Sequence, residues 1–590
     1  MSTGVKKKAS RPAKRPGLEP MTAGSRLKQM APKRLDTLRI PGFAKLFFLA
    51  LLAGTVCYFP ALRGQFLFDD VTLPFLNPHA ATLPLPAWFG VRPVVMLSYL
   101  LNYKLFGTEA VSYHLVSLLL HACCAALVFL IVNKVLVFMA IPERTRTLAA
   151  AFSGAVFLLH PLQTESVSYI AARSEPMSAL FLLTALYIFV SRHDAGIRFP
   201  AALGVLGLFG LAVASKESAV VLPAVLLLTD YYWNPGFGLR GIKANWRLYI
   251  PLLLSTVFAA ALVFRIAAQG GTVGFHLASS NAVDYLLTQF RAIFLYFRLF
   301  LLPFGQNADW GLPISHSPLD KGAIFYGLAL ALLTGLAVFY RKRYKLASYG
   351  FLLALIFLSP TSSVVPIADP MAERRMYLPL LGLLFVSCEF ITRARFDYKT
   401  LNTVLALLCL AFGLVAIKRN FVWDSPEALW RDAIAKRPQN VRALMDLGVA
   451  LINRNACAEA SEYLRRAVVI RHDYQLLSDL AAAQSCRGDK DAALATYMDA
   501  AAIQETPQLW ISVATIRFNR GEVSAALDAL DRAQKKDPAF PNTYVARGNL
   551  FLAVRKFSDA EQQFRFVLNG DPDNAPARQG LMHAVVDAQR

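Results

Sequence analysis

Apolar segments long enough to cross a lipid bilayer recur along most of this 590-residue chain. A membrane-spanning helix needs about 20 apolar residues, with tolerance down to about 17. The segments lie at 44–62, 112–138, 148–162, 174–191, 199–215, 217–232, 248–267, 322–340, 346–366, 376–392 and 400–418. Because a backbone in lipid must satisfy its own hydrogen bonds, they predict an all-α polytopic bundle of about eleven spans. Hydrophobic residues make up 56% of the chain and charged residues 17%, which excludes an ordinary soluble protein.

Basic loops set the expected orientation of these spans. The first 43 residues are strongly basic and predict a retained cytoplasmic tail. Segment 285–303 carries Arg291 and Arg298 on one helical face, so we expect it to lie in the membrane interface. With eleven crossings, every inner loop is basic and the C-terminal part lies outside, in a periplasm or lumen. The net charge of +22 then reflects cytoplasmic loops and anionic lipid rather than nucleic acid.

From about residue 424 the sequence becomes polar, rich in alanine and periodic. Two series of small residues recur at 33 to 34 residues: Gly448, Ala481, Ala514 and Gly548, and Ala460, Ala493, Ala526 and Ala560. This is the tetratricopeptide (TPR) spacing. Four residues after the second series come Leu464, Tyr497, Leu530 and Phe564, which we expect to fill the space beside the small residues. Pro507, Pro538 and Pro572 are expected to end the second helices.

These patterns divide the chain into three parts: a tail at 1–43, a membrane domain at 44–419 and a TPR α-solenoid at 420–590. The solenoid is expected to contain four repeats and a terminal helix from Ala575. Its concave surface would bind a partner protein, and the alternative is a structural spacer.

Polar residues gather in the predicted outer loops, which points to a site on that side. Adjacent carboxylates at Asp69 and Asp70 could supply a general base, because like charges side by side raise one pKa. The alternative is a solvated loop or a helix cap. Five cations share the same side, where a phosphate-bearing ligand would need them: Arg92, Arg173, Lys216, Arg374 and Arg375.

No metal-ligand spacing is present in the sequence. His114 and His121 lie seven residues apart on the second span, so we interpret them as buried, satisfied histidines. Cys457 and Cys486 are the two cysteines outside apolar runs, and the sequence leaves their redox state open.

The order of the outer motifs resembles a known family. The motifs are Phe68-Asp69-Asp70, Arg92-Pro93, Tyr113-His114, His160-Pro161 with Thr164-Glu165, Ala172-Arg173-Ser174-Glu175, Ser215-Lys216-Glu217, Asp309-Trp310 and Glu373-Arg374-Arg375-Met376-Tyr377. Together with the repeats, they resemble the transmembrane and tetratricopeptide repeat-containing O-mannosyltransferases of the GT-C glycosyltransferase superfamily. Relatives commonly have Gly-Arg-Ala-Asp where this chain has Ala172 to Glu175, and the eukaryotic members have more repeats. A bacterial member with another sugar and acceptor fits these departures.

The resemblance implies an integral-membrane protein O-glycosyltransferase that uses a polyprenyl-phosphate sugar and inverts the anomeric carbon. It implies that Asp69 or Asp70 is the base and that Arg374, Lys216, Arg173 and Arg92 bind the donor phosphate. The remaining polar motif residues would support the substrate site: His160, Glu165, Glu175, Glu217, Asp309, Glu373 and Tyr377. No resident cofactor is implied, and participation of a divalent cation is left open. The membrane would be the bacterial inner membrane, or the endoplasmic reticulum of a eukaryote.

Two other readings compete with this one. A ligase or polymerase of lipid-linked glycans shares most of the signals. A non-catalytic membrane-anchored TPR scaffold, or a transporter, is a different class. A scaffold would tolerate loss of the Asp pair, and a transporter would place its charges near the middle of the bilayer rather than at one rim.

Overall fold

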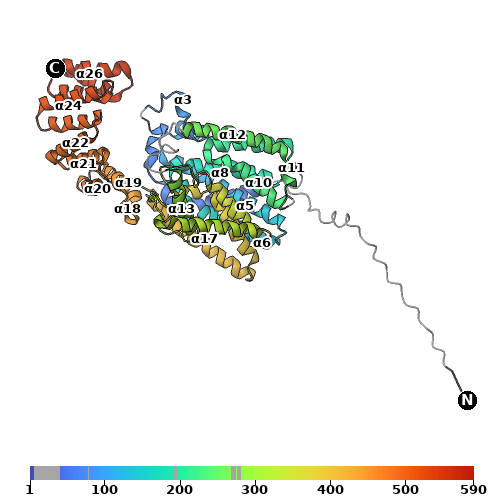
Figure 1. The fold of residues 1–590 in the computed structure, drawn as a ribbon. Helices are drawn as coiled ribbons and strands as arrows, with labels where there is room; N and C mark the ends of the chain where they lie inside the picture. Colours follow the sequence, from blue (N-terminus) through green and yellow to red (C-terminus); the bar gives the residue numbers. More distant parts are fainter. Residues whose placement is uncertain are drawn as a thin grey trace. The chain divides into compact units, whose positions relative to one another are not determined.

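A computed structural model describes residues 1–4, 40–77, 79–191, 196–234, 236–267, 274 and 281–589 of the chain (Figure 1). The predicted basic tail, 1–43, lies almost entirely outside these residues. The described residues form helices, short 3₁₀ turns and loops, and no β-strand element is found among them. The all-helical prediction is therefore confirmed over the described part of the chain.

Helices occupy all eleven segments in which a span was predicted. The helices of the apolar part are α2 (Ile40–Leu62), α3 (Leu85–Trp88), α4 (Pro93–Phe106), α5 (Ala110–Phe138), α6 (Glu143–Leu159), α7 (Thr164–Ser168), α8 (Ser174–Ser191), α9 (Phe199–Ser215), α10 (Leu222–Trp233), α11 (Arg240–Ala244), α12 (Trp246–Ala267), α13 (Ala282–Leu301), α14 (Ala323–Phe339), α15 (Lys345–Leu358), α16 (Pro379–Arg393) and α17 (Tyr398–Asn420). Short 3₁₀ turns lie between them: η1 (Phe68–Thr72), η2 (Pro74–Leu76), η3 (Pro161–Gln163), η4 (Ile170–Arg173), η6 (Glu217–Val221), η7 (Asp320–Gly322), η8 (Glu373–Met376) and η9 (Phe421–Trp423).

Five stretches of the described residues are long and apolar enough to cross a membrane. They are Gly42–Leu62, Ala110–Phe138, Ile170–Ser191, Asp320–Phe339 and Tyr398–Trp423. Shorter apolar helices at Phe199–Ser215, Trp246–Ala261 and Lys345–Leu358 add to the bundle. The chain is thus a membrane protein, and the count of eleven crossings stays a prediction.

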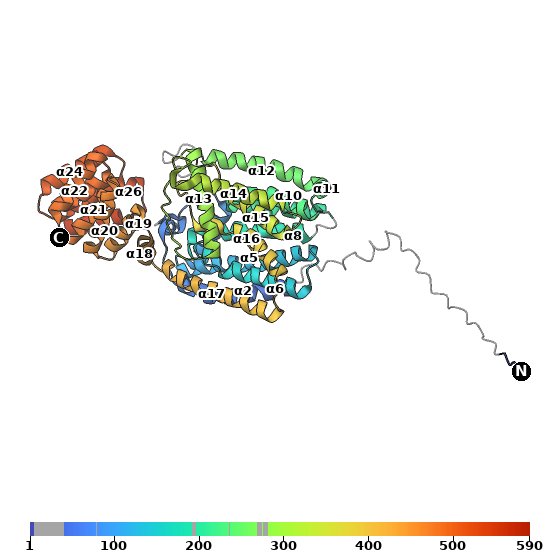
Figure 2. The same ribbon diagram turned by 60° about the horizontal axis from the view of Figure 1, so that its bottom comes forward.

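The bundle is built around buried helices (Figures 1 and 2). Helix α5 packs against α6 and α8, and α8 packs against α9. Helices α15 and α16 approach at Gly350 and Gly382, where a Cβ added to Gly350 would lie 2.3 Å from the Gly382 carbonyl oxygen. Small residues allow this close contact of helix backbones in a membrane. Helix α14 instead exposes Leu328, Leu332 and Phe339, as expected of a lipid-facing helix.

Helix α13 covers the segment predicted to lie in the interface. The Asn281 side chain caps its first turn by accepting from the backbone N–H groups of Val283 and Asp284. Arg291 donates to the Pro313 carbonyl at 2.9 Å, and Arg298 donates to the Phe304 carbonyl at 2.8 Å. Both arginines therefore hold the outer loop that follows the helix. The depth of α13 in the membrane stays a prediction.

The second part of the chain forms the predicted solenoid. Helix α18 (Pro426–Lys436) precedes four helix pairs, and α27 (Ala575–Ala588) follows them. The pairs are α19 (Val441–Asn453) with α20 (Cys457–Ile470), α21 (Tyr474–Arg487) with α22 (Lys490–Ile503), α23 (Pro507–Phe518) with α24 (Val523–Lys536), and α25 (Pro541–Ala553) with α26 (Phe557–Gly570).

The small residues of the repeat motif meet the large ones as expected. A Cβ added to Gly448 would lie 2.5 Å from Cγ of Leu464, and one added to Gly548 would lie 2.7 Å from the ring of Phe564. The prediction that Pro507 ends a second helix was wrong, because this proline is the first residue of α23. Proline suits this position, since the N–H groups of the first turn make no hydrogen bond within the helix. Cys457 and Cys486 form a disulfide that joins α20 to α21.

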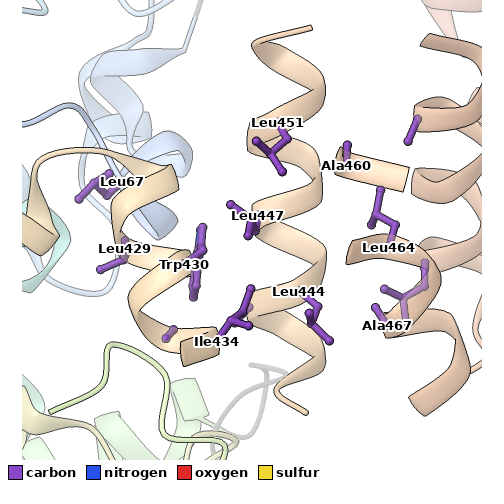
Figure 3. Packing of buried hydrophobic residues seen from close by; sticks show 14 of the residues in the cluster. Leu67, Leu429, Trp430, Ile434, Leu444, Leu447, Leu451, Ala460, Leu464 and Ala467 are labelled. Atoms are coloured by element: carbon purple, nitrogen blue, oxygen red, sulfur yellow. The ribbon is translucent and has the colours of Figure 1, made fainter. Parts of the chain in front are cut away.

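A single hydrophobic cluster continues from the outer loops into the first repeat (Figure 3). Leu67 of the first outer loop lies beside Leu429 and Trp430 of α18, and Trp430 in turn faces Leu447 of α19. All four side chains are buried. The solenoid is therefore packed directly against the loop that carries Asp69 and Asp70.

Candidate active site

A cavity of about 270 Å³ opens among the loops that were predicted to lie outside. Five separate stretches of sequence meet there: η1, the start of α4, the η4–α8 junction, the segment that carries Lys216 and the segment that carries Arg374. The polar and aromatic side chains that line it are Asp69, Thr72, Arg92, Tyr99, Tyr169, Ser174, Glu175, Lys216 and Arg374. The cavity thus combines one exposed carboxylate with three cations.

The two adjacent aspartates have different environments. Asp70 is buried, and its carboxylate accepts hydrogen bonds from the backbone N–H of Leu67 at 2.9 Å and of Ala171 at 2.6 Å. Burial raises the pKa of Asp70 to about 7, although these two amides oppose the shift. Asp69 is exposed and lines the cavity, and its backbone N–H donates to the Tyr169 hydroxyl at 3.0 Å. Asp70 therefore ties η1 to η4, while Asp69 lines the cavity.

Backbone strain at Phe68 occurs immediately before the two aspartates. Phe68 has φ = 51°, a left-handed conformation that a bulky residue adopts only when its surroundings impose it. Its ring lies between Trp430, at 5.3 Å, and Tyr169, at 5.9 Å between ring centroids. The Arg442 guanidinium lies 5.7 Å from the same ring. The first helices of the solenoid therefore help to hold the turn that presents Asp69.

Two of the predicted phosphate-binding cations reach the cavity with a carboxylate at their side. Arg92 makes a bidentate ion pair with Glu217, with both N–O distances at 3.0 Å, and also donates to the Ser174 hydroxyl at 3.4 Å. Lys216 pairs with Glu175. Burial and the nearby charges of Arg92 and Arg374 lower the pKa of Lys216 well below its usual value.

Arg374 and Arg375 point to different surroundings. Arg374 lines the cavity and pairs with the buried Glu165, whose other oxygen accepts from the Arg374 backbone N–H at 3.0 Å. This carboxylate raises the pKa of Arg374 despite its burial. Arg375 instead donates to backbone carbonyls, that of Pro370 at 2.9 Å among them. The planar forks of the two arginines thus serve different purposes: one faces the cavity and the other fastens the preceding loop.

Arg173 lies outside the cavity lining. It is fully buried, its guanidinium stacks 4.5 Å from the centroid of Tyr99, and it donates to the Tyr113 carbonyl at 2.9 Å and the Ser98 hydroxyl at 3.1 Å. Tyr99, on which the guanidinium stacks, is a lining residue, whereas Arg173 is not. In this structure Arg173 supports the cavity wall.

Glu373 is the centre of a hydrogen-bond network behind the cavity. Its carboxylate accepts from the Gln306 side chain at 2.6 Å, from the Asn307 backbone N–H at 2.7 Å and from the Trp310 indole at 3.0 Å. Burial raises the pKa of Glu373 to about 7, although Arg419 opposes the shift. The network holds the outer loop that leads to Asp309.

Asp309 faces the solenoid. Arg442 of α19 lies 3.6 Å from its carboxylate and 3.0 Å from that of Asp369. The same arginine covers Phe68. One side chain of the first repeat therefore connects three outer loops.

His160 and Tyr377 are buried below the cavity and do not line it. His160 bonds through Nε2 to the Phe300 carbonyl at 3.0 Å, and Nδ1 accepts from the backbone N–H of Leu162 at 3.2 Å. The Tyr377 hydroxyl contacts Nδ1 of His121 at 2.8 Å. These contacts give both residues a supporting role.

Among the polar and aromatic residues of the cavity wall, sequence reasoning missed Thr72, Tyr99 and Tyr169, and it quoted Ser174 only as part of a motif. Tyr169 lies in the sequence between the motifs that contain Glu165 and Arg173, and this position could have marked it as a residue of the site. Among the residues that the structure describes, no group of three or more His, Cys, Asp or Glu side chains could hold a metal ion.

Comparisons with known proteins agree with the family resemblance. The mouse "Protein O-mannosyl-transferase TMTC3" is 24% identical over 598 residues, which cover 88% of this chain and 63% of that protein. The human "Protein O-mannosyl-transferase TMTC1" is 24% identical over 498 residues, covering 72% of this chain and 55% of that protein. These relatives are protein O-mannosyl-transferases by name. The chain spans less than two thirds of their length.

Comparisons with family models and with solved structures add less. No protein-family model matches the chain. Among solved structures, a thermophilic TPR protein of Thermus thermophilus is similar at 18% identity with a TM-score of 0.26, over 31% of this chain and 96% of that chain.

Proposed function

We propose that this protein is a membrane protein O-glycosyltransferase that moves one sugar from a polyprenyl-phosphate donor to a hydroxyl group of an acceptor protein. The observation that carries the proposal is the cavity, which the exposed Asp69 lines together with Arg92, Lys216 and Arg374. The similarity to protein O-mannosyl-transferases over most of the chain supports it and favours mannose as the sugar.

The reaction is a direct displacement at the anomeric carbon. The acceptor oxygen forms the new bond from the face opposite the phosphate, the sugar–phosphate bond breaks, and the configuration inverts. Asp69 accepts the hydroxyl proton, because Asp70 uses both its oxygens on backbone amides. The polyprenyl phosphate leaves as an anion that the three cations stabilise. Positioning and charge neutralisation supply most of the catalysis.

The solenoid holds the acceptor protein on the outer side. Basic loops on the opposite side support this orientation. The disulfide between Cys457 and Cys486 supports it too, because disulfides persist in the periplasm and in the lumen of the secretory pathway. A membrane-impermeant thiol reagent applied to a variant with a cysteine after residue 589 should label that cysteine from outside the cell.

The size of the cavity favours a single sugar over a whole glycan. At about 270 Å³ it is slightly smaller than most ligand pockets, which commonly measure roughly 300–1,000 Å³. A ligase of lipid-linked glycans and a non-catalytic scaffold are the alternatives. The test is transfer by the purified full chain, in lipid nanodiscs, from radiolabelled polyprenyl phosphomannose to serine- and threonine-containing peptides. Transfer of a lipid-linked oligosaccharide instead would favour the ligase, and no transfer from either donor would favour the scaffold.

A further inference from the structure

The Lys216–Glu175 pair differs from the other two ion pairs of the cavity. Glu217 and Glu165 hold Arg92 and Arg374 from outside the cavity lining, whereas Glu175 lines the cavity together with Lys216. The side chains of Lys216 and Glu175 are 13% and 8% exposed. Glu175 is the hydrogen-bond partner of the Lys216 ammonium within the described structure. A carboxylate therefore occupies the side of Lys216 on which a ligand would arrive.

A phosphodiester bound by Lys216 would bring a second negative charge next to Glu175. Two anions at close range in a partly buried site do not both stay ionised without cost, so one of them gains a proton or moves away. A phosphodiester is a far stronger acid than a carboxylic acid. The proton therefore goes to Glu175.

We propose that Glu175 is a built-in counter-anion, which holds Lys216 in the empty site and releases it to the donor phosphate while taking up a proton from solvent. The inference rests on the proposed polyprenyl-phosphate donor. Glu175 then keeps the cation in place before the donor arrives, and donor binding becomes stronger as the pH falls.

Other charged and titratable groups face the same space. Asp69, Arg92, Arg374, Tyr99 and Tyr169 share the cavity wall. Behind the wall, Glu217 and Glu165 are each held by two hydrogen bonds to their arginines, and Arg173 lies behind Tyr99. Lys216 is the competing proton acceptor, because burial and neighbouring cations lower its pKa. A variant that removes only the Glu175 carboxyl shows whether Glu175 or Lys216 takes up the proton.

The experiment measures binding of short-chain polyprenyl phosphomannose to the full chain in nanodiscs by calorimetry between about pH 5.5 and 8.5. For uptake of one proton, the affinity of the wild type should rise by up to about tenfold for each pH unit of acidification. Glu175→Gln should bind the probe about tenfold more tightly than the wild type at the alkaline end and lose most of the pH dependence. Glu217→Gln is the matched control and should bind no more tightly while keeping the pH dependence.

Four results would overturn the inference. Weaker binding by Glu175→Gln at every pH would show that Glu175 only fixes Lys216 in place. An unchanged pH dependence in that variant would assign the proton to Lys216. Calorimetry of the wild type in two buffers of different ionisation enthalpy needs no variant, and zero proton uptake there would also refute it. If neither protein binds the probe at any pH, the proposed donor is wrong, and the inference falls with it.

Discussion

Replacing Trp430 by alanine tests whether the solenoid controls the geometry of the site. Trp430 is 2% exposed, lies in the cluster that joins α18 to the first outer loop, and contacts Phe68 edge to face. Removing a buried tryptophan costs about 3–5 kcal/mol of packing free energy. The left-handed conformation of Phe68 costs about 1–3 kcal/mol, so loss of its support should let the turn relax.

Relaxation of Phe68 would move Asp69, the next residue in the chain. A displacement of about 1 Å at a reacting group can lower the rate roughly 100-fold, so we expect kcat to fall by about that factor. The assay is transfer to a short peptide, measured as initial rates over a range of peptide concentrations. With a short peptide, binding along the solenoid does not dominate the measured rate.

Trp510→Ala is the matched control. Trp510, a residue of α23, is 3% exposed and belongs to a different hydrophobic cluster from Trp430. Its replacement should lower the thermal stability of the solenoid by a similar amount and leave kcat on the short peptide nearly unchanged. Equal kcat values for Trp430→Ala and the wild type would refute the coupling between repeats and site.

Three further predictions concern individual contacts. Arg374→Lys should weaken binding of polyprenyl phosphomannose by about tenfold, because lysine lacks the planar fork of the guanidinium. Arg375→Lys should change the affinity little. Equal, negligible effects of the two substitutions in a binding titration would remove Arg374 from the donor site. Gly548→Leu should lower the melting temperature of the solenoid, since overpacking costs about 1–3 kcal/mol, and an unchanged melting curve would contradict the close contact. Because burial raises the pKa of Asp70 and Glu373 to about 7, above their unfolded values of about 4, the stability from their protonated forms is full below about pH 4 and is lost as the pH rises to about 7. The melting temperature should therefore fall between about pH 4 and pH 7 and level off above, less so in Glu373→Gln, and the opposite slope would refute this.

The sequence predicted those features of the fold that depend on local pattern. Apolar length marked the long helices of the bundle but not α3, α4, α7 or α11. The 33- to 34-residue period placed Gly448 against Leu464, because helices in one repeat meet at fixed spacing. Of the Asp69-Asp70 pair and the motif cations, Asp69, Arg92, Lys216 and Arg374 line one cavity, and the role of each stays a prediction.

Features that depend on long-range contacts were not predictable. The sequence gives no sign that Asp70 bonds to Ala171, about a hundred residues away, and so it left the two aspartates equivalent. It likewise could not show that Arg173 turns behind Tyr99, because a short 3₁₀ turn has no fixed buried face. The junction of Phe68 with Trp430 joins residues of two predicted domains, and neither repeat spacing nor hydropathy reports such a contact.

The proposal that Asp69 is the base is tested most directly by transfer from polyprenyl phosphomannose with Asp69→Asn and Asp70→Asn side by side. Asparagine cannot take a proton, so Asp69→Asn should lose about 100- to 10,000-fold in rate while its donor affinity and melting temperature stay near those of the wild type. Asp70→Asn should melt at a lower temperature, because one amide oxygen replaces two acceptors for the Leu67 and Ala171 amides, a loss of about 1–3 kcal/mol. Full transfer activity in Asp69→Asn would contradict the assignment of the base.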